Sequence, residues 1–196
     1  MEHTQNSEAV DRMFMSARSQ NGWQDKPVDV ELLKKIQELA QMGPTSVNCQ
    51  PSRLVFLVTL SAKERIKPML APGNVEKTMT APVVTIVAYD LDFVETLPSL
   101  FPHKDMREMF AGKADMIEST AFRNGTLQGA YLLLAARALG LDCGPMSGFD
   151  NKAVDQEFFK GTNIRSNFLL NLGHGDPAAL FPQSPRLGFD EIADVL

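Results

Sequence analysis

The sequence predicts an α+β protein, and three observations support that class. Two runs of β-branched and other apolar residues, at 53–59 and 82–89, are typical of buried strands. Segments at 30–42 and 115–139 place apolar residues at the spacing of a helix face. These helices and strands do not alternate regularly along the chain. An irregular order favours an α+β domain over a doubly wound α/β domain.

The composition is that of one globular domain. The chain has 196 residues, of which 44% are hydrophobic and 22% are charged. A chain of this length buries roughly 70% of the surface that its unfolded form exposes, so one core can stabilise it. We therefore expect a single domain over 1–196.

Charge and terminal patterns exclude several classes of protein. The chain has 19 basic and 24 acidic residues, and 19 − 24 gives a net charge of −5 without a basic cluster, which disfavours nucleic acid. No apolar run approaches the roughly 18 residues of a membrane span. Residues 1–10 lack the basic and apolar regions of a secretion signal. We expect a cytoplasmic protein without a membrane partner, in which Cys49 and Cys143 stay reduced.

Two helices are expected before the first strand. The first covers 8–18, where apolar residues share one helix face: Val10, Met13, Phe14 and Ala17. The second covers 30–42, with Asp29 as its N-terminal cap and Gly43 at its end.

The next segments alternate strand, helix and strand. The segment 53–59 contains an unbroken apolar run at 54–58, which suits a strand buried on both faces. Ser61 and Glu64 have the spacing of a capping box for a short helix, which Pro68 should end or kink. A loop at 72–74 then leads to a central strand at 82–89.

The second half contains the least regular segment and the longest helix. Residues 90–114 read as an excursion of loops and short helices with exposed bulky groups, which could cover a pocket. The helix at 115–139 is apolar almost all round near 130–141, so it belongs in the core or at a subunit interface. A strand at 142–146, a helix at 150–159 and a strand at 167–172 follow. Pro182 and Pro185 mark an extended tail.

Several common catalytic motifs are missing from the sequence. There is no Gly-x-Gly-x-x-Gly opening a helix and no Gly-Lys-Ser phosphate loop, and 144–148 lacks the spacing of a nucleophile elbow. The three histidines, His3, His103 and His174, are too scattered to indicate a metal site or a catalytic triad. Ordinary hydrolase and Rossmann interpretations are weakened.

Five segments, taken in order, resemble the nitroreductase-like family of FMN-dependent oxidoreductases. Residues 18–23 (RSQNGW) are similar to the family's Arg-Ser-x-Arg-x-Phe stretch, and 43–51 (GPTSVNCQP) to its Pro-Ser-x-x-Asn-x-Gln-Pro motif. Residues 74–77 (NVEK) match an Asn-x-x-Lys motif, 144–149 (GPMSGF) the loop under the flavin ring, and 185–187 (PRL) a C-terminal basic motif. The order makes accident improbable, although no single match is specific.

The resemblance is closest to the malonic semialdehyde reductases of uracil degradation. That subgroup shares residues 21–23, 43–46, 100–103 (LFPH), 144–150 and 185–187 with this chain. Two positions depart from the wider family. Asn21 replaces a basic residue of the phosphate motif, and Ser147 replaces a Glu that is common in nitroreductases, so the substrate preference is open.

The resemblance implies that the two ends of the chain hold the FMN phosphate. A phosphate dianion favours guanidinium, hydroxyl and amide donors, which Arg18, Ser19, Asn21 and Arg186 would supply. The alternative is that Arg18 and Arg186 are solvated surface charges, and for either residue alone that alternative is the better one. As a pair within the family pattern, they are candidates for phosphate binding.

The second motif is expected to face the edge of the flavin ring. Asn48 and Gln50 offer amide donors and acceptors that suit the pyrimidine edge, with Thr45 and Ser46 beside them. The prolines at the two ends of the motif would stiffen the loop. The alternative is a plain polar loop after a helix.

Lys77 has the clearest chemical logic of the candidates. An ammonium near N1 and O2 of the ring would stabilise the negative charge that arrives with hydride at N5. Asn74, three residues earlier, supports this role, whereas the alternative is a surface lysine. In the fourth motif, Pro145, Met146, Ser147 and Gly148 would pass beneath the ring, with backbone amides of Ser147 and Gly148 near N5. The alternative there is a plain turn.

The irregular segment supplies weaker substrate candidates. His103 and Lys104 could reach a substrate carboxylate, with Phe101 beside them. A solvated loop is the better interpretation from the residues alone, and Phe101 and Phe110 could simply pack. His174, between two glycines, reads as structural.

The resemblance implies a nitroreductase-like fold, in which helices flank a central mixed sheet and homodimerisation completes the domain. FMN would lie in two pockets at the subunit interface. NADH or NADPH would reduce the flavin at N5, and malonic semialdehyde would then take the hydride to give 3-hydroxypropionate, in ping-pong order. One alternative is a broad nitroreductase or quinone reductase, and another is a flavin-binding protein without turnover. No metal is expected, the proton donor is not identified, and the choice of nicotinamide stays open.

Overall fold

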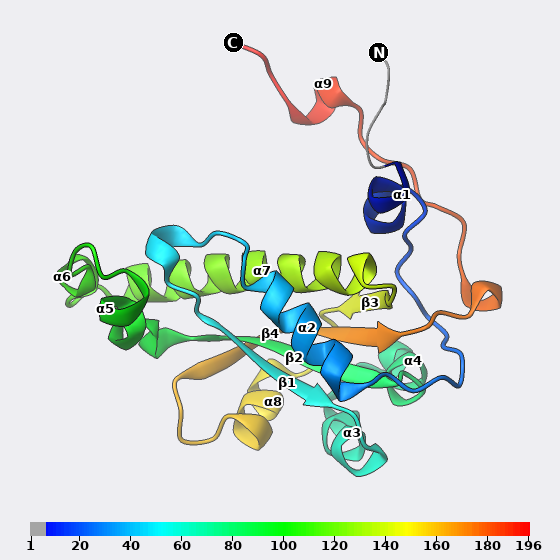
Figure 1. The fold of residues 1–196 in the computed structure, drawn as a ribbon. Coiled ribbons are helices and arrows are strands. Elements are labelled where there is room, and N and C mark those ends of the chain that lie inside the picture. Colours follow the sequence, from blue (N-terminus) through cyan, green and yellow to red (C-terminus); the bar gives the residue numbers. More distant parts are fainter. Residues whose placement is uncertain (1–6) are drawn as a thin grey trace.

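A four-stranded sheet forms the centre of the protein in a computed structural model that describes residues 7–196 (Figure 1). Its strands are β1 (Ser52–Leu57), β2 (Val83–Asp90), β3 (Asp142–Met146) and β4 (Ile164–Gly173), in the order β1-β2-β4-β3. All three pairings between these strands are antiparallel. The α+β class is confirmed, and the sheet is antiparallel rather than mixed. Parallel pairing within 7–196 is restricted to a bridge between Ser19 and Cys143.

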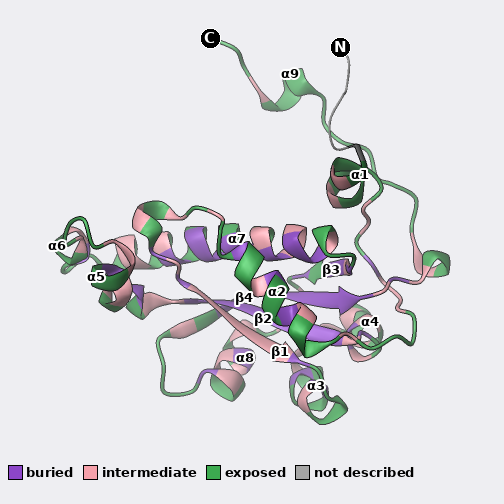
Figure 2. Ribbon diagram, in the orientation of Figure 1, coloured by how far each residue is buried: buried purple, intermediate pink, exposed green. Residues whose placement is uncertain are grey.

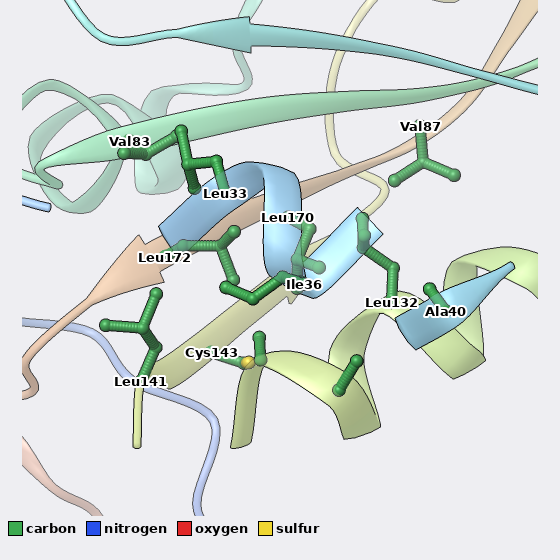
Figure 3. Packing of buried hydrophobic residues seen from close by; sticks show 12 residues of the cluster. Leu33, Ile36, Ala40, Val83, Val87, Leu132, Leu141, Cys143, Leu170 and Leu172 are labelled. Atoms are coloured by element: carbon green, nitrogen blue, oxygen red, sulfur yellow. The ribbon is translucent and has the colours of Figure 1, made fainter. Parts of the chain in front are cut away.

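Helices cover both faces of the sheet. On one face, α2 (Val30–Ala40) and α7 (Ala114–Ala138) pack against alternate residues of β2 and β4. Figure 3 shows this layer, in which Leu33 and Ile36 of α2 lie beside Leu132 of α7 and Leu170 of β4. On the other face, α3 (Leu60–Ile66) and α8 (Asn151–Phe158) cover the remaining residues of the strands. The core therefore lies on both sides of β2.

Strong end signals place several elements close to their predicted bounds. The Asp29 carboxylate accepts a hydrogen bond from the Glu31 amide at the start of α2, and Asp150 caps α8 in the same way. Strand β3 has its predicted bounds, and β2 is buried from Val83 to Tyr89, as a central strand should be. Helix α7 agrees with the predicted 115–139 to one residue at each end.

The first helix and the first strand differ from the predictions. Helix α1 (Ser7–Val10) continues as a π-helix over Asp11–Met15, so the predicted helix at 8–18 ends early. The Arg18 guanidinium takes the carbonyl oxygens that a continuing helix would use. Strand β1 is half-buried rather than buried on both faces, because it lies at the edge of the sheet. An apolar run does not distinguish an edge strand from a central one.

The cap of α3 also differs from the prediction. The hydroxyl of Thr59 accepts a hydrogen bond from the Ala62 amide at 3.1 Å, so the helix begins before the expected Ser61 and Glu64 capping box. Pro68 lies just beyond the helix, in a 3-10 turn at Lys67–Met69. The loop at Pro72–Asn74 is another 3-10 turn, and it leads into α4 (Val75–Met79).

The irregular segment has a small core of its own. It contains a 3-10 helix (Leu91–Thr96), α5 (Leu97–Leu100) and α6 (Arg107–Phe110). The expected exposure of its bulky groups is wrong for Phe93 and Phe110, which are buried against each other with ring centroids 5.1 Å apart. Their burial anchors the segment to α7.

The tail leaves the body of the protein on the same side as α1 (Figure 1). It follows a 3-10 turn at Pro177–Ala179 and is extended except for one helical turn, α9 (Phe189–Ile192), which the sequence did not predict. Figure 2 shows that it is exposed along most of its length. Within 7–196, none of the helices has the length and apolar character needed to cross a bilayer.

Candidate functional site

The predicted site residues lie in two groups at opposite ends of β2. Ser52 pairs with Tyr89, and the Asp90 amide donates to the Pro51 carbonyl at 2.8 Å, so the segment 44–50 enters the sheet at the C-terminal end of β2. Helix α4, which carries Lys77, precedes the N-terminal end of the same strand. Seven steps of about 3.3 Å separate these ends by about 23 Å. Loop 44–50 is the first group, and α4 with the segments packed on it is the second.

Loop 44–50 has a strained backbone. Val47, Asn48 and Gln50 have φ values of 47°, 53° and 39°, and within 7–196 they are the non-glycine residues with positive φ. This conformation is a true outlier for a β-branched residue such as Val47, and it costs about 1–2 kcal/mol for each ordinary residue. Strain of this kind collects at binding and catalytic sites, where the surrounding structure holds it in place. This strain favours a binding role for loop 44–50 over the alternative of a plain polar loop.

Side chains within the loop hold its shape. The Gln50 amide nitrogen Nε2 donates to Asn48 Oδ1 at 2.8 Å, and the Gln50 backbone amide donates to Thr45 Oγ1 at 3.2 Å. Asn48 Nδ2 donates to the Leu100 carbonyl at 2.8 Å, which connects the loop to the end of α5. Cys49, a residue of the same loop, is fully buried, and that burial raises the pKa of its thiol.

Helix α7 holds the loop from below. Asn124 Oδ1 accepts a hydrogen bond from the Ser46 amide at 2.9 Å, and one turn later Gln128 Oε1 accepts from the Ser52 amide at 2.9 Å. The Tyr131 hydroxyl donates to the Pro44 carbonyl at 3.1 Å. These supports were not predicted from the sequence. The available signal was a pair of polar residues, four apart, on the buried face of an apolar helix.

In the second group, the third and fourth motifs meet. Asn74 Nδ2 donates to the Gly148 carbonyl at 2.8 Å, and the Ala71 amide donates to the same oxygen at 3.0 Å. A Cβ at Gly148 would lie 2.6 Å from Asn74 Nδ2. A side chain at position 148 would therefore displace the Asn74 amide from this contact. Pro145 and Ser147 are exposed beside this contact. Met146 is buried, and its sulfur accepts a hydrogen bond from the hydroxyl of a threonine in α4.

Lys77 is held through its backbone. Its carbonyl oxygen accepts hydrogen bonds from Trp23 Nε1 at 2.8 Å and from Asn171 Nδ2 at 3.0 Å. Lys63, which is buried, donates from Nζ to the carbonyls of Met79 and Ala81 at the end of the same helix. The Lys77 side chain is half-buried, and its ammonium takes part in none of the ion pairs formed within 7–196.

The first motif runs alongside β3 to reach α4. Ser19 bridges to Cys143, and the Gln20 amide donates to the Cys143 carbonyl at 2.9 Å. A Cβ at Gly144 would lie 2.8 Å from the Gln20 carbonyl, so glycine lets this segment lie against the strand. Asn21 is half-buried at the turn toward Trp23.

The structure brings the tail to Arg18 but leaves Arg186 apart. Arg18 Nη2 donates to Gln183 Oε1 at 3.3 Å, and Nη1 donates to three nearby carbonyls. Arg186 Nη1 donates to the carbonyls of Ser184 and Pro185, its immediate neighbours. Both guanidiniums lack a carboxylate partner within 7–196.

The substrate candidates lie with the first group. Phe101 and His103 form an edge-to-face pair with ring centroids 5.5 Å apart, directly after the Leu100 carbonyl that Asn48 contacts. His103 and Lys104 are exposed. Within one chain, these residues and Lys77 therefore belong to different groups.

Two hollows are lined by residues other than the predicted site residues. One of about 360 Å³ opens between α2, α7 and β1, with Gln37, Arg53 and Phe56 in its lining. Another of about 650 Å³ lies beside Trp23 and Lys63. Within 7–196, no three His, Cys, Asp or Glu side chains gather as a metal site would need.

The fold and the candidate site can now be compared with those of known proteins. The fold is an antiparallel α+β fold, and the site consists of a strained polar loop and a separate helix that carries a lysine. A sequence profile described as the nitroreductase family matches residues 15–174. A protein of Burkholderia lata is 60% identical over 192 residues, covering 98% of each chain, and one of Stenotrophomonas maltophilia K279a is 54% identical, covering 100% of each. Both carry the provisional name NADH dehydrogenase/NAD(P)H nitroreductase.

The fold agrees with solved structures. A protein of Exiguobacterium sibiricum 255-15, described provisionally as a nitroreductase and solved in complex with FMN, superposes with a TM-score of 0.86 at 22% identity. The match covers 97% of this chain and 98% of that one. The chain belongs to the nitroreductase family.

Proposed function

We propose that this protein is an FMN-dependent NAD(P)H oxidoreductase that acts as a homodimer. The observation that carries the proposal is the state of Lys77, a half-buried residue whose ammonium forms no ion pair within 7–196 and whose backbone is fixed by Trp23 and Asn171. A cation held in this way favours a ligand that carries or gains negative charge. Membership of the nitroreductase family supports the same class of reaction.

The residues present fit FMN. Arg18 and Ser19 offer a guanidinium and a hydroxyl for a phosphate, and Arg186 offers a second guanidinium if the tail moves toward a cofactor. Gly148 presents a bare backbone beside Asn74, where an added Cβ would lie 2.6 Å from Nδ2 and displace that amide. Loop 44–50 presents the polar groups of Thr45, Ser46, Asn48 and Gln50 from a backbone that is held under strain. Asn21 contributes an amide where the wider family has a charge.

The chain's own residues would direct the chemistry. FMN, when bound, supplies a ring that accepts hydride from NADH or NADPH at N5 and passes it to a second substrate. Lys77 would stabilise the negative charge that appears at the N1 and O2 edge of the ring. Backbone amides of Ser147 and Gly148 would lie near N5, with Pro145 and Met146 shaping the same turn.

The two groups favour a site that is shared between two chains. They lie about 23 Å apart along β2, so loop 44–50 and Lys77 of one chain cannot contact the same ring. A second copy would place the loop of one protomer beside the α4 of the other. Exposed apolar side chains are available for such an interface on the first helix and the tail: Val10, Phe14, Met15, Phe181, Leu187 and Phe189.

Malonic semialdehyde, reduced to 3-hydroxypropionate, is the substrate that we propose. The resemblance of residues 100–103, 144–150 and 185–187 to the malonic semialdehyde reductases supports it. His103 and Lys104 are exposed beside loop 44–50, where a cation would attract the substrate carboxylate. A second candidate is nitro or quinone reduction, which the provisional names of the relatives favour.

The first experiment is a visible spectrum of the purified protein, followed by mass identification of whatever heat releases. A flavin spectrum and released FMN are expected. Anaerobic NADH and NADPH should then bleach the bound flavin, and kcat/KM for malonic semialdehyde against a nitroaromatic should decide between the two substrates. If neither NADH nor NADPH bleaches the flavin, the result would indicate a flavin-binding protein without turnover. A colourless protein that takes up no FMN would refute the whole proposal.

A further inference from the structure

We infer that Trp23 and Asn171 are positioning residues for Lys77, and that they act through its backbone carbonyl to raise the flavin's reduction potential. The inference rests on the proposed function, because it assigns an effect to residues that would not touch the cofactor. Its direct evidence is the pair of hydrogen bonds to the Lys77 carbonyl, at 2.8 Å from Trp23 Nε1 and at 3.0 Å from Asn171 Nδ2.

The two donors reach α4 from separate parts of the fold. Trp23 ends the segment that runs along β3, and Asn171 lies in β4 opposite Gly144. A Cβ at Gly144 would lie 3.2 Å from the Trp23 ring and 3.5 Å from Asn171 Cβ, so the glycine lets both side chains converge. Both lone pairs of one carbonyl are thereby used, which fixes the position of Lys77 along and around its helix.

The burial of Asn171 indicates that its donor is the useful group. Its side chain is fully buried, and Oδ1 accepts no hydrogen bond within 7–196. An unpaired buried acceptor is costly, and replacement by an apolar side chain would remove that cost. The contribution of this amide to the structure is therefore the hydrogen bond from Nδ2 to the Lys77 carbonyl.

Position matters for a short helix with a charged side chain. Helix α4 has five residues, Val75–Met79, so its internal hydrogen bonds alone cannot fix it. Its last carbonyls are held separately by Lys63. Without Trp23 and Asn171, Lys77 would keep its charge but lose its fixed place. The expected effect is weaker preference for the reduced flavin, without loss of the fold.

The test uses Trp23→Phe, Asn171→Leu and the double variant in the full-length holoprotein. Phenylalanine keeps an aromatic ring and removes the N–H. Leucine keeps the branching at Cγ and the number of heavy atoms of the Asn171 side chain, and it removes the unpaired oxygen. The double variant should bind reduced FMN relative to oxidised FMN about threefold to tenfold more weakly than the wild type, as expected for loss of ordinary hydrogen bonds. That change corresponds to a midpoint potential lower by about 14 to 30 mV for a two-electron couple.

A matched control comes from the other end of β4. Asn151 Nδ2 donates to the Ser166 carbonyl at 2.9 Å, so Asn151→Leu removes a similar bond to the same strand. It should leave the potential unchanged. A wild-type potential in the double variant, or an equal shift in Asn151→Leu, would overturn the inference.

Two further measurements separate this inference from the proposed function. Lys77→Ala should lower the potential more than the double variant does. An unchanged potential in Lys77→Ala overturns the role of Lys77 and with it this inference, but leaves the proposed function standing as long as NADH or NADPH bleaches the bound flavin. A shift in Lys77→Ala without one in the double variant overturns the positioning role alone. In the protein without flavin, amide hydrogen exchange over 75–81 should accelerate in the double variant and not in Asn151→Leu, and equal protection in both would also contradict the inference.

The chain offers one more readout. Trp23 is its sole tryptophan, so intrinsic fluorescence reports this contact directly. Asn171→Leu should make Trp23 emission more accessible to a soluble quencher in the flavin-free protein, and unchanged quenching would count against coupling between the two donors.

Discussion

Gly148→Ala tests whether the close approach of the 144–148 turn to α4 is as tight as the structure shows. The added Cβ would lie 2.6 Å from Asn74 Nδ2, whereas ordinary contact begins at 3.4 Å. The Asn74 amide must therefore retreat by 3.4 − 2.6 = 0.8 Å. The hydrogen bond to the Gly148 carbonyl would lengthen from 2.8 Å toward 3.6 Å, beyond the usual limit of about 3.2 Å.

The expected loss of stability follows from that displacement. The hydrogen bond contributes about 1 kcal/mol, and overpacking costs about 1 to 3 kcal/mol more. The free energy of unfolding should fall by roughly 2 to 4 kcal/mol, and Tm by about 4 to 16 °C for a chain of this size. Both are measured on the flavin-free protein by denaturant unfolding and thermal melting, because bound cofactor would add its own stabilisation.

Two companion variants identify the cause. Gly73→Ala has no atom within 4 Å of its new Cβ, so it should leave stability unchanged or raise it by up to about 1 kcal/mol. Asn74→Ala should cost about 1 kcal/mol, and Gly148→Ala should then cost much less in its presence, because the obstructing amide is gone. Additive losses in the double variant, or a Gly148→Ala protein that melts like the wild type, would show that this reasoning is wrong.

Three other outcomes are expected. Lys77→Ala should slow reduction of bound flavin more than it weakens FMN binding, whereas Arg18→Ala should chiefly weaken binding; rapid-mixing kinetics and FMN titration would contradict these roles if they gave the reverse. Burial and, as a smaller cause, the charge of Lys26 lower the pKa of His174 below 6.5. At a pH between the lowered pKa and 6.5, the His174 side chain therefore binds more protons in the unfolded chain than in the folded protein. The free energy of unfolding should therefore fall as the pH drops below about 6.5, and His174→Gln should flatten this dependence in denaturant titrations at about pH 7.5 and pH 5.5; an unchanged slope would exclude His174 as its source. Burial raises the pKa of Cys143 to about 12 and also raises that of Cys49. Both thiols should resist alkylation at about pH 8 until the chain unfolds, and mass spectrometry that detects rapid labelling of the native protein would contradict their burial.

Local signals predicted the elements that have clear ends. Asp29 and Asp150 cap helices α2 and α8, and the apolar run of 82–89 is a buried central strand. The sequence could not show that β1 lies at an edge, because that depends on which strands pair. It also could not show that the first helix ends early, where the Arg18 guanidinium takes up the carbonyls of Met15, Ser16 and Ala17.

The site was predictable as segments but not as an arrangement. The resemblance identified Asn74 and Gly148 separately, and the structure places their side chain and carbonyl 2.8 Å apart. Asn124 and Asn171 were missed because their partners are backbone groups far away in the sequence, which no local pattern encodes. The separation of loop 44–50 from Lys77 follows from strand pairing alone.

The placement of the two groups at opposite ends of β2 has a consequence for how the protein behaves on dilution. In the proposed dimer, a pocket that needs both ends exists only while two protomers are associated. Cofactor retention and subunit association then become a single linked equilibrium, in which each stabilises the other by mass action. Flavin should be released as the protein is diluted below the dissociation constant of the dimer, and excess FMN should hold the protomers together at concentrations where they would otherwise separate.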